Sequence, residues 1–327
     1  MSASEPRTPV PGNTVRTSGR PIAVLTGPTG TGKSDIALQL AREFPIEIVS
    51  VDSAQVYRGL DIGSAKPDAA TRAAVRHHLL DLVDASAVYS AGQFVRDATD
   101  AIADIESRGR IPLLVGGTML YLRALITGLA TLPQGSESVR TEIDADAARL
   151  GWPAMHERLA KVDPAAAARI HPNDAQRIQR ALEVHAVEGR PISELQRVTA
   201  PMLARPFLVT ALVPSDRARL HAALARRFET MMAAGLLEEV RTLFERGDLT
   251  PESPAIRAVG YRQLWSHVSG SVSLETAREA AVAATRQLAK RQMTWLRSMP
   301  NIRTFDPYDA QGFVGVRESL ITAFYPL

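Results

Sequence analysis

The chain has 327 residues, 45% of them hydrophobic, so it can bury the core of one large domain or two ordinary ones. Its 38 Lys and Arg against 35 Asp and Glu give a net charge of +3, too mild to indicate a nucleic-acid partner by itself. The absence of cysteine excludes disulfides, thiolate metal sites and a cysteine nucleophile, and no apolar run approaches the roughly 18–20 residues that span a bilayer.

The first twenty residues, MSASEPRTPVPGNTVRTSGR, contain no apolar core and are rich in Pro, Ser, Thr and Gly. A secretory signal needs an apolar core, so we expect no export and a cytoplasmic protein. The same composition predicts a disordered N-terminal tail over 1–20.

Short apolar segments ended by Gly, Pro or Asp then alternate with helical patterns. Strands that alternate with helices predict right-handed βαβ units and a parallel sheet with helices on both faces, an α/β fold of the P-loop NTPase-like type. The predicted strands are PIAVLTG (21–27), IEIVSVD (46–52), HHLLDLV (77–83), RIPLLVGG (110–117) and PFLVTALV (206–213), and the predicted helices between them are 33–44, 91–108 and 118–127.

The character of the chain changes between 132 and 206, where strand signals vanish. Short helices are predicted at 137–150, 154–162 and 173–189, the last with Asn173 as its N-cap and Gly189 at its end. We interpret 132–206 as an all-helical insertion into an α/β core formed by 21–131 and 207–327. The core continues with predicted helices at 216–235, 236–246, 255–267 and 274–299.

A phosphate-binding loop joins the first predicted strand to the first predicted helix. Glycines let backbone N–H groups turn around an anion, the helix N-terminus adds partial positive charge, Lys33 adds a full one, and the Ser34 hydroxyl can bind Mg²⁺. The pattern predicts a bound diphosphate or triphosphate without saying which. The loop consists of Gly27, Pro28, Thr29, Gly30, Thr31, Gly32, Lys33 and Ser34.

An acidic residue follows the strand 46–52 but not the strand 110–117. Hydrolysing NTPases usually hold Mg²⁺ with a carboxylate after a core strand. The strand 110–117 ends in Gly116, Gly117 and then Thr118, which weighs against ATP hydrolysis. Asp52 ends the other strand, where parallel strands face a ligand crevice, so it can serve as a Mg²⁺ ligand, a general base or a structural turn residue.

Several segments together resemble the tRNA dimethylallyltransferases over about 21–307. This resemblance implies that the loop grips the leaving diphosphate of dimethylallyl diphosphate. It also implies transfer of the five-carbon group to N6 of the adenine 3′ of the anticodon, in tRNAs that read codons beginning with U. The matching segments are GPTGTGKS (27–34), DSAQVYRGLDIGSAKP (52–67), HHLLDL (77–82), VGGTMLYLRAL (115–125), HPNDAQRIQRALEV (171–184), AIRAVGYRQLW (255–265) and TRQLAKRQMTWLR (285–297).

The resemblance also assigns roles to residues of the reaction site. Lys33 and Mg²⁺ on Ser34 stabilise the leaving oxygens, and Arg227 (or the adjacent Arg226) helps to clamp the diphosphate. Asp52 then fits as the general base that removes the N6 proton. Thr118 is expected to hydrogen-bond the adenine or a neighbouring phosphate.

The RNA partner is expected to be the anticodon stem-loop, its target base turned out into a pocket. The insertion would grip the anticodon arm. Arg286, Lys290 and Arg297 form a predicted basic stripe on the last long helix, and we expect a monomer that needs no membrane. The expected tRNA-binding residues are Asp52, Ser53, Ala54, Gln55, Thr118, Arg140, Gln176, Arg177, Ile178, Gln179, Arg180, Arg257, Gly260, Tyr261, Arg262, Gln263, Arg286 and Lys290.

Three alternatives share part of this pattern. A P-loop small-molecule kinase would carry an arginine-rich lid and usually lacks so large a helical insertion. An isopentenyltransferase for free AMP would have no use for the helix around 171–180 as an RNA grip. A non-catalytic RNA-binding module would not need Lys33, Ser34 and Asp52 together.

Overall fold

The computed structural model describes residues 19–130, 132–133, 135–197, 199–309 and 311–325. The tail predicted over 1–20 therefore lies almost wholly outside the described residues. The chain divides into two compact units: the first comprises Met1–Leu122 and Leu203–Leu327, and the second is Arg123–Met202. No helix of the described part is both long and apolar enough to cross a membrane.

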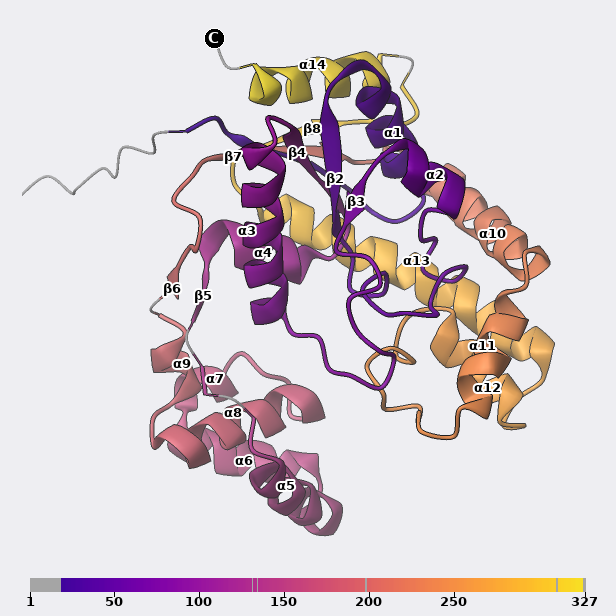
Figure 1. Cartoon of the computed structure of the whole chain (residues 1–327). Coiled ribbons are helices and arrows are strands. Elements are labelled where there is room, and N and C mark those ends of the chain that lie inside the picture. Colours follow the sequence, from indigo (N-terminus) through magenta and orange to yellow (C-terminus); the bar gives the residue numbers. More distant parts are fainter. Residues whose placement is uncertain (1–18, 131, 134, 198, 310, 326–327) are drawn as a thin grey trace, which may run out of the picture. The chain divides into compact units, whose positions relative to one another are not determined.

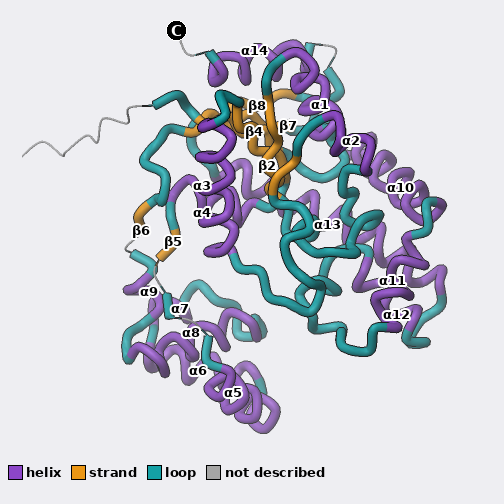
Figure 2. Tube along the Cα trace, viewed as in Figure 1, coloured by secondary structure: helices purple, strands orange, loops and turns teal. Residues whose placement is uncertain are grey.

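The first unit is built on a six-stranded sheet in the order β3-β2-β4-β1-β7-β8. Every neighbouring pair is parallel, which confirms the predicted α/β fold. The strands lie at the centre of this unit with helices around them (Figure 2). They are β1 (Ile22–Thr26), β2 (Ile46–Val51), β3 (His77–His78), β4 (Ile111–Gly116), β7 (Phe207–Leu212) and β8 (Ile302–Phe305).

Helices cover both faces of this sheet. Successive side chains of a strand point to opposite faces, so the packing partners of two neighbouring residues of β7 show what covers each face. Leu212 packs in a cluster with residues of α1 and α14, whereas its neighbour Ala211 packs with Met119 of α4 and Leu296 of α13. The helices of this unit (Figure 1) are α1 (Lys33–Glu43), α2 (Ala69–Ala74), α3 (Ala91–Ser107), α10 (Arg217–Ala233), α11 (Leu236–Glu245), α12 (Tyr261–Val268), α13 (Leu274–Ser298) and α14 (Gly312–Phe324), together with the first turn of α4 (Met119–Thr127), which continues into the second unit.

Two predicted elements are shorter than expected, and several observed elements were not predicted. Of the strand predicted at 77–83, only His77–His78 pairs with β2, because Leu79 and Asp81 adopt positive φ values of 64° and 55°. The helix predicted from 255 begins only at Tyr261, after Gly260 with φ 95°. β8 and α14 were not predicted, although both belong to the sheet and its cover.

The second unit is helical, with a small core of its own. Its apolar cluster includes Ile143, Leu159 and Ile178. Asp174 caps α8 by accepting from the Arg177 amide at 3.2 Å, so the predicted N-cap, Asn173, is wrong by one residue. The helical insertion was predicted over 132–206, and the compact unit in the structure is Arg123–Met202. The elements are α5 (Glu137–Leu150), α6 (Trp152–Val162), α7 (Pro164–Ala167), α8 (Ala175–Glu188) and α9 (Ile192–Leu195), with a short antiparallel pair of β5 (Leu129–Ala130) and β6 (Thr199–Ala200).

Candidate active site

The glycine-rich loop leaves β1 at Thr26 and enters α1 at Lys33, as its sequence predicts. Gly27 has φ 145°, and a Cβ there would lie 2.6 Å from the Leu212 carbonyl oxygen, so only glycine fits beside β7. The Pro28 carbonyl accepts from Thr31 Oγ1 at 2.8 Å and from Lys33 Nζ at 2.7 Å. The loop is therefore closed on itself, and Lys33 is held against it.

Lys33 is the cation most affected by its surroundings. Burial and the nearby Arg227 guanidinium lower its pKa from 10.5 to about 7, while Asp52 acts in the opposite direction. An ammonium group that is costly to keep charged in a protein gains strongly from an anion beside it. The loop thus offers a site whose charge depends on whether an anion is bound.

Asp52 follows β2 and faces the same space. Its Oδ1 accepts from the Ala54 amide at 2.8 Å and from the Gln55 amide at 3.4 Å, which fixes the carboxyl group over the end of the strand. Burial raises the pKa of Asp52, whereas these amide bonds and the charges of Lys33 and Arg227 partly offset that rise. A fixed carboxylate with a raised pKa is a stronger proton acceptor.

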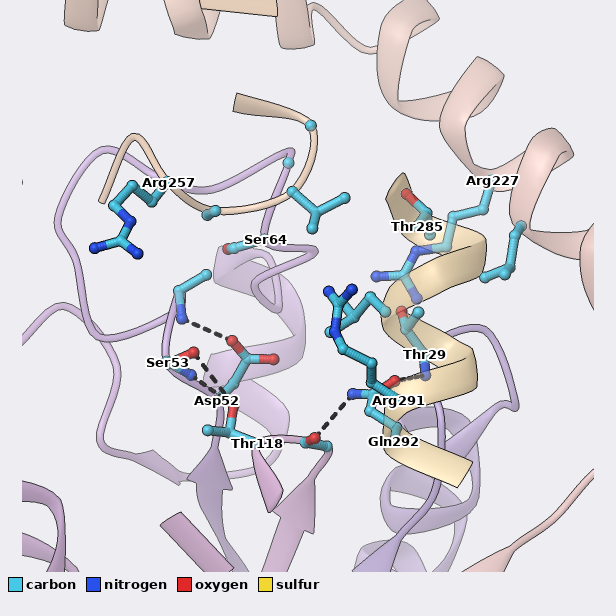
Figure 3. A pocket seen from close by; sticks show the side chains of 18 of the residues that line it. Thr29, Asp52, Ser53, Ser64, Thr118, Arg227, Arg257, Thr285, Arg291 and Gln292 are labelled. Carbon is cyan, nitrogen blue, oxygen red and sulfur yellow. Dashed lines mark hydrogen bonds between the residues drawn. The ribbon is translucent and has the colours of Figure 1, made fainter. Parts of the chain in front are cut away.

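Gln292 joins the glycine-rich loop to the end of β4. It was not among the site residues predicted from the sequence. Gln292 Oε1 accepts from the Thr29 amide at 2.9 Å, and Gln292 Nε2 donates to the Gly117 carbonyl at 2.8 Å (Figure 3). Next to Gly117, Thr118 Oγ1 accepts from the Ser53 amide at 3.0 Å. The ends of β1, β2 and β4 are thereby tied together around one space.

Two cavities meet at this point. The smaller, of about 210 Å³, is lined by Lys33 and Ser34. The larger, of about 470 Å³, has mainly apolar walls that include Leu224, Phe228, Met231, Leu288 and Trp295, with Arg257 and Arg291 among them. Both are lined by Thr29, Asp52, Ser64, Gly117, Arg227 and Gln292.

The structure distinguishes the two adjacent arginines of α10. Arg227 lines both cavities, and burial lowers its pKa against the opposing effects of Asp52 and Asp35. Arg226 lines neither cavity and is exposed. Of the pair, Arg227 is therefore the one placed to meet a ligand between Lys33 and Asp52.

Several residues expected to bind tRNA in the first unit border the larger cavity. Asp52, Ser53, Ala54, Thr118, Arg257 and Gly260 line it, and Arg262, Arg286 and Lys290 are exposed. Gln55 is instead engaged within the protein, with Ser50 and the carbonyls of Ser64 and Ala65, and Gln263 accepts from the Gly260 amide at 2.9 Å.

Tyr261 was predicted to bind tRNA, and this prediction is corrected because its side chain is fully buried and cannot contact RNA. Its hydroxyl donates to Glu239. The sequence signal for this was the apolar face of α12, on which Tyr261, Leu264 and Trp265 are all buried.

In the second unit, Ile178 is also corrected. It is fully buried in the helical core and offers no side-chain contact to RNA. Gln176 and Arg177 are exposed, and Gln179 Nε2 donates to Asp144 at 2.6 Å.

Two expected RNA-binding arginines of this unit hold one buried carboxylate. Glu183 is 1% exposed and pairs with Arg140 at 2.8 Å and with Arg180 at 2.6 Å. Arg140 remains half exposed, so it can meet a phosphate while paired, whereas Arg180 also donates to the Pro133 carbonyl at 2.7 Å.

The chain is similar to known proteins over most of its length. Residues 55–299 match the family model described as IPP transferase. A tRNA dimethylallyltransferase of Bordetella petrii is 56% identical over 286 residues, covering 86% of this chain and 91% of the relative, and one of Ralstonia pickettii is 53% identical over 289 residues, covering 86% and 89%.

Solved structures are similar as well. The tRNA isopentenylpyrophosphate transferase of Bacillus halodurans has a TM-score of 0.67 at 33% identity, over 94% of this chain and 98% of that one. A eukaryotic dimethylallyltransferase acting on tRNA has a TM-score of 0.76 at 28% identity, over 93% and 78%.

Proposed function

This chain belongs to the IPP transferase family, and we propose that it transfers the dimethylallyl group of dimethylallyl diphosphate to an adenine of tRNA. It is a transferase, as are the tRNA dimethylallyltransferases it resembles. The acceptor we propose is N6 of the adenine 3′ of the anticodon, in tRNAs that read codons beginning with U, and the leaving group is diphosphate.

One observation carries the proposal: Asp52 lies where the smaller cavity, which Lys33 and Ser34 line, meets the larger cavity with its mainly apolar walls. Lys33, Ser34 and Arg227 suit a diphosphate on one side, and the apolar walls suit an adenine and a five-carbon chain on the other. No carboxylate follows β4, where Gly116 and Gly117 stand, so the arrangement favours a diphosphate that leaves over a triphosphate that is hydrolysed.

The residues match the demands of the reaction. The bond between the allylic carbon and the diphosphate oxygen breaks, a bond from adenine N6 to that carbon forms, and one N6 proton passes to Asp52. Because the amine is a weak nucleophile, stabilisation of the departing oxygens matters most, and Lys33 and Arg227 supply it electrostatically.

Mg²⁺ fits as the proposed metal only together with the diphosphate. The described residues contain no group of three or more His, Asp or Glu side chains able to hold a metal ion. Mg²⁺ is commonly bound by one or two protein oxygens plus substrate phosphates, and the Ser34 hydroxyl is the protein oxygen offered here, with Asp52 nearby. When bound, the ion would neutralise charge on the leaving diphosphate.

The RNA partner is proposed to be the anticodon stem-loop, bound by a monomer. Exposed Arg262, Arg286 and Lys290 on α12 and α13 support contacts to phosphates. Arg257 and Thr118 at the larger cavity support contacts to the turned-out base.

The direct test supplies labelled dimethylallyl diphosphate, Mg²⁺ and an unmodified anticodon stem-loop, with free AMP as the competing acceptor. We expect label in the RNA alone. Label in AMP would instead indicate the adenylate isopentenyltransferase, and phosphate transfer from ATP would indicate a kinase.

A further inference from the structure

The Glu239 carboxylate on α11 accepts hydrogen bonds from three consecutive backbone amides, those of residues 61–63. Glu239 Oε2 accepts from the Asp61 amide at 3.0 Å and from the Ile62 amide at 2.7 Å, and its Oε1 accepts from the Gly63 amide at 3.1 Å. Three N–H groups converging on one point form an anion-binding concavity, and here a side chain of the protein fills it.

The same carboxylate fixes a second segment through Tyr261. The Tyr261 hydroxyl donates to Glu239 Oε1, and burial and that carboxylate raise the pKa of the phenol, so it remains a donor. The Tyr261 ring closes the contact, because a Cβ on Gly63 would lie 2.6 Å from the ring. Glu239 therefore joins the turn 61–63 to the start of α12.

These two segments form one wall of the larger cavity. Gly63, the last residue of the turn, and the following Ser64 line it, and residues 257–260 line it directly before Tyr261. Figure 3 shows Ser64 and Arg257 on neighbouring loops. The segment that carries the turn 61–63 has a second contact within the protein, since Lys66 Nζ pairs with Asp61 and with Asp81, each at 2.6 Å.

We propose that Glu239 is a positioning residue for the acceptor base: by holding the turn 61–63 and Tyr261 together, it sets the cavity wall that places the adenine against Asp52. This inference rests on the proposed function. The groups that meet the diphosphate, Lys33 and Arg227, belong to other segments, so we expect the role to affect the RNA substrate far more than binding of the diphosphate. A purely structural role would affect both substrates alike.

The test compares Glu239→Ala and Glu239→Gln with Glu238→Gln, a matched control one residue earlier on α11. The Glu238 side chain is 70% exposed and pairs with Arg241. Tyr261→Phe removes only the phenol donor. For each variant we would measure kcat/KM for the anticodon stem-loop, the Kd of dimethylallyl diphosphate, and hydrogen–deuterium exchange of the peptide that contains 61–63.

Glu239→Ala is expected to lower kcat/KM for the stem-loop about 10- to 100-fold, since small misplacements of a reacting group have effects of this size. Exchange at 61–63 should accelerate, and the diphosphate Kd should stay within about threefold. Glu239→Gln keeps one acceptor oxygen and should lose less activity. Tyr261→Phe should have little further effect in the Glu239→Ala background, and Glu238→Gln should match the wild type.

Normal stem-loop kinetics in Glu239→Ala despite rapid exchange at 61–63 would overturn the proposal, as would equal losses for both substrates. If Glu239→Ala does not fold, Glu239→Gln and Tyr261→Phe answer the same question. A wild-type enzyme that labels no RNA contradicts the proposed function itself, whereas an active wild type with an unaffected Glu239→Ala contradicts only the positioning role.

Discussion

Binding of the allyl diphosphate should be coupled to protonation of Lys33. The pKa of this side chain in the free protein is lowered to about 7, so about nine tenths of it is charged at pH 6 and about one tenth at pH 8. A bound diphosphate favours the charged form and raises the pKa again. Affinity should therefore weaken about tenfold between pH 6 and pH 8, and binding at pH 8 should take up about 0.9 proton.

Isothermal titration calorimetry in two buffers of different ionisation enthalpy measures this uptake. The ligand titrates too, so the informative quantity is the difference between the wild type and Lys33→Arg, whose guanidinium stays charged throughout. The variant should lose the Lys33 part of the uptake and bind with a flatter pH dependence. Identical proton uptake by both proteins would refute the reasoning.

Three further predictions concern named side chains. Asp52→Asn should lower kcat about 10²- to 10⁴-fold without weakening diphosphate binding, and a single-turnover assay with calorimetry would reveal an unchanged rate if Asp52 is not the base. Arg227→Gln should weaken diphosphate binding about 10-fold or more, while Arg226→Gln should not; equal Kd values for the two variants would argue against the assignment. Glu47, 4% exposed, has its pKa lowered to about 2, chiefly by the Arg108 hydrogen bond, so its stabilisation should be lost as the pH falls from about 4.5 to about 2. Glu47→Ala should lower the free energy of unfolding by about 3 kcal/mol at pH 7, measured by denaturant titration; a change under about 1 kcal/mol would contradict the buried ion pair.

Local patterns predicted most of the core fold. The first strand, the glycine-rich loop and the helix from Lys33 were all predicted from short-range signals, and the structure has them at 22–26, 27–32 and 33–43. The apolar run 77–83 misled, because Leu79 and Asp81 turn in the left-handed region, which no pattern of hydrophobicity encodes. The strand 302–305 was missed because its residues are only partly buried and alternate weakly.

The site was harder to predict than the fold, because its geometry depends on long-range contacts. Gln292 meets the loop across 263 residues of chain, and Glu239 meets the Ile62 amide across 177. The local sequence around a glutamine or glutamate in a helix does not indicate such a distant partner. Tyr261 and Ile178 were given RNA-binding roles by segment resemblance, whereas burial assigns their side chains to the interior. Resemblance identifies segments, and packing then decides which side chains of a segment reach the surface.

The most direct measurement is a structure of the protein with an unmodified anticodon stem-loop and a non-reactive thio analogue of dimethylallyl diphosphate. We expect the diphosphate at the 27–34 loop against Lys33 and Arg227, and the N6 of a turned-out adenine within about 3 Å of the Asp52 carboxylate. A diphosphate bound elsewhere, or an adenine N6 far from Asp52 with the base still stacked in the RNA, would contradict this expectation.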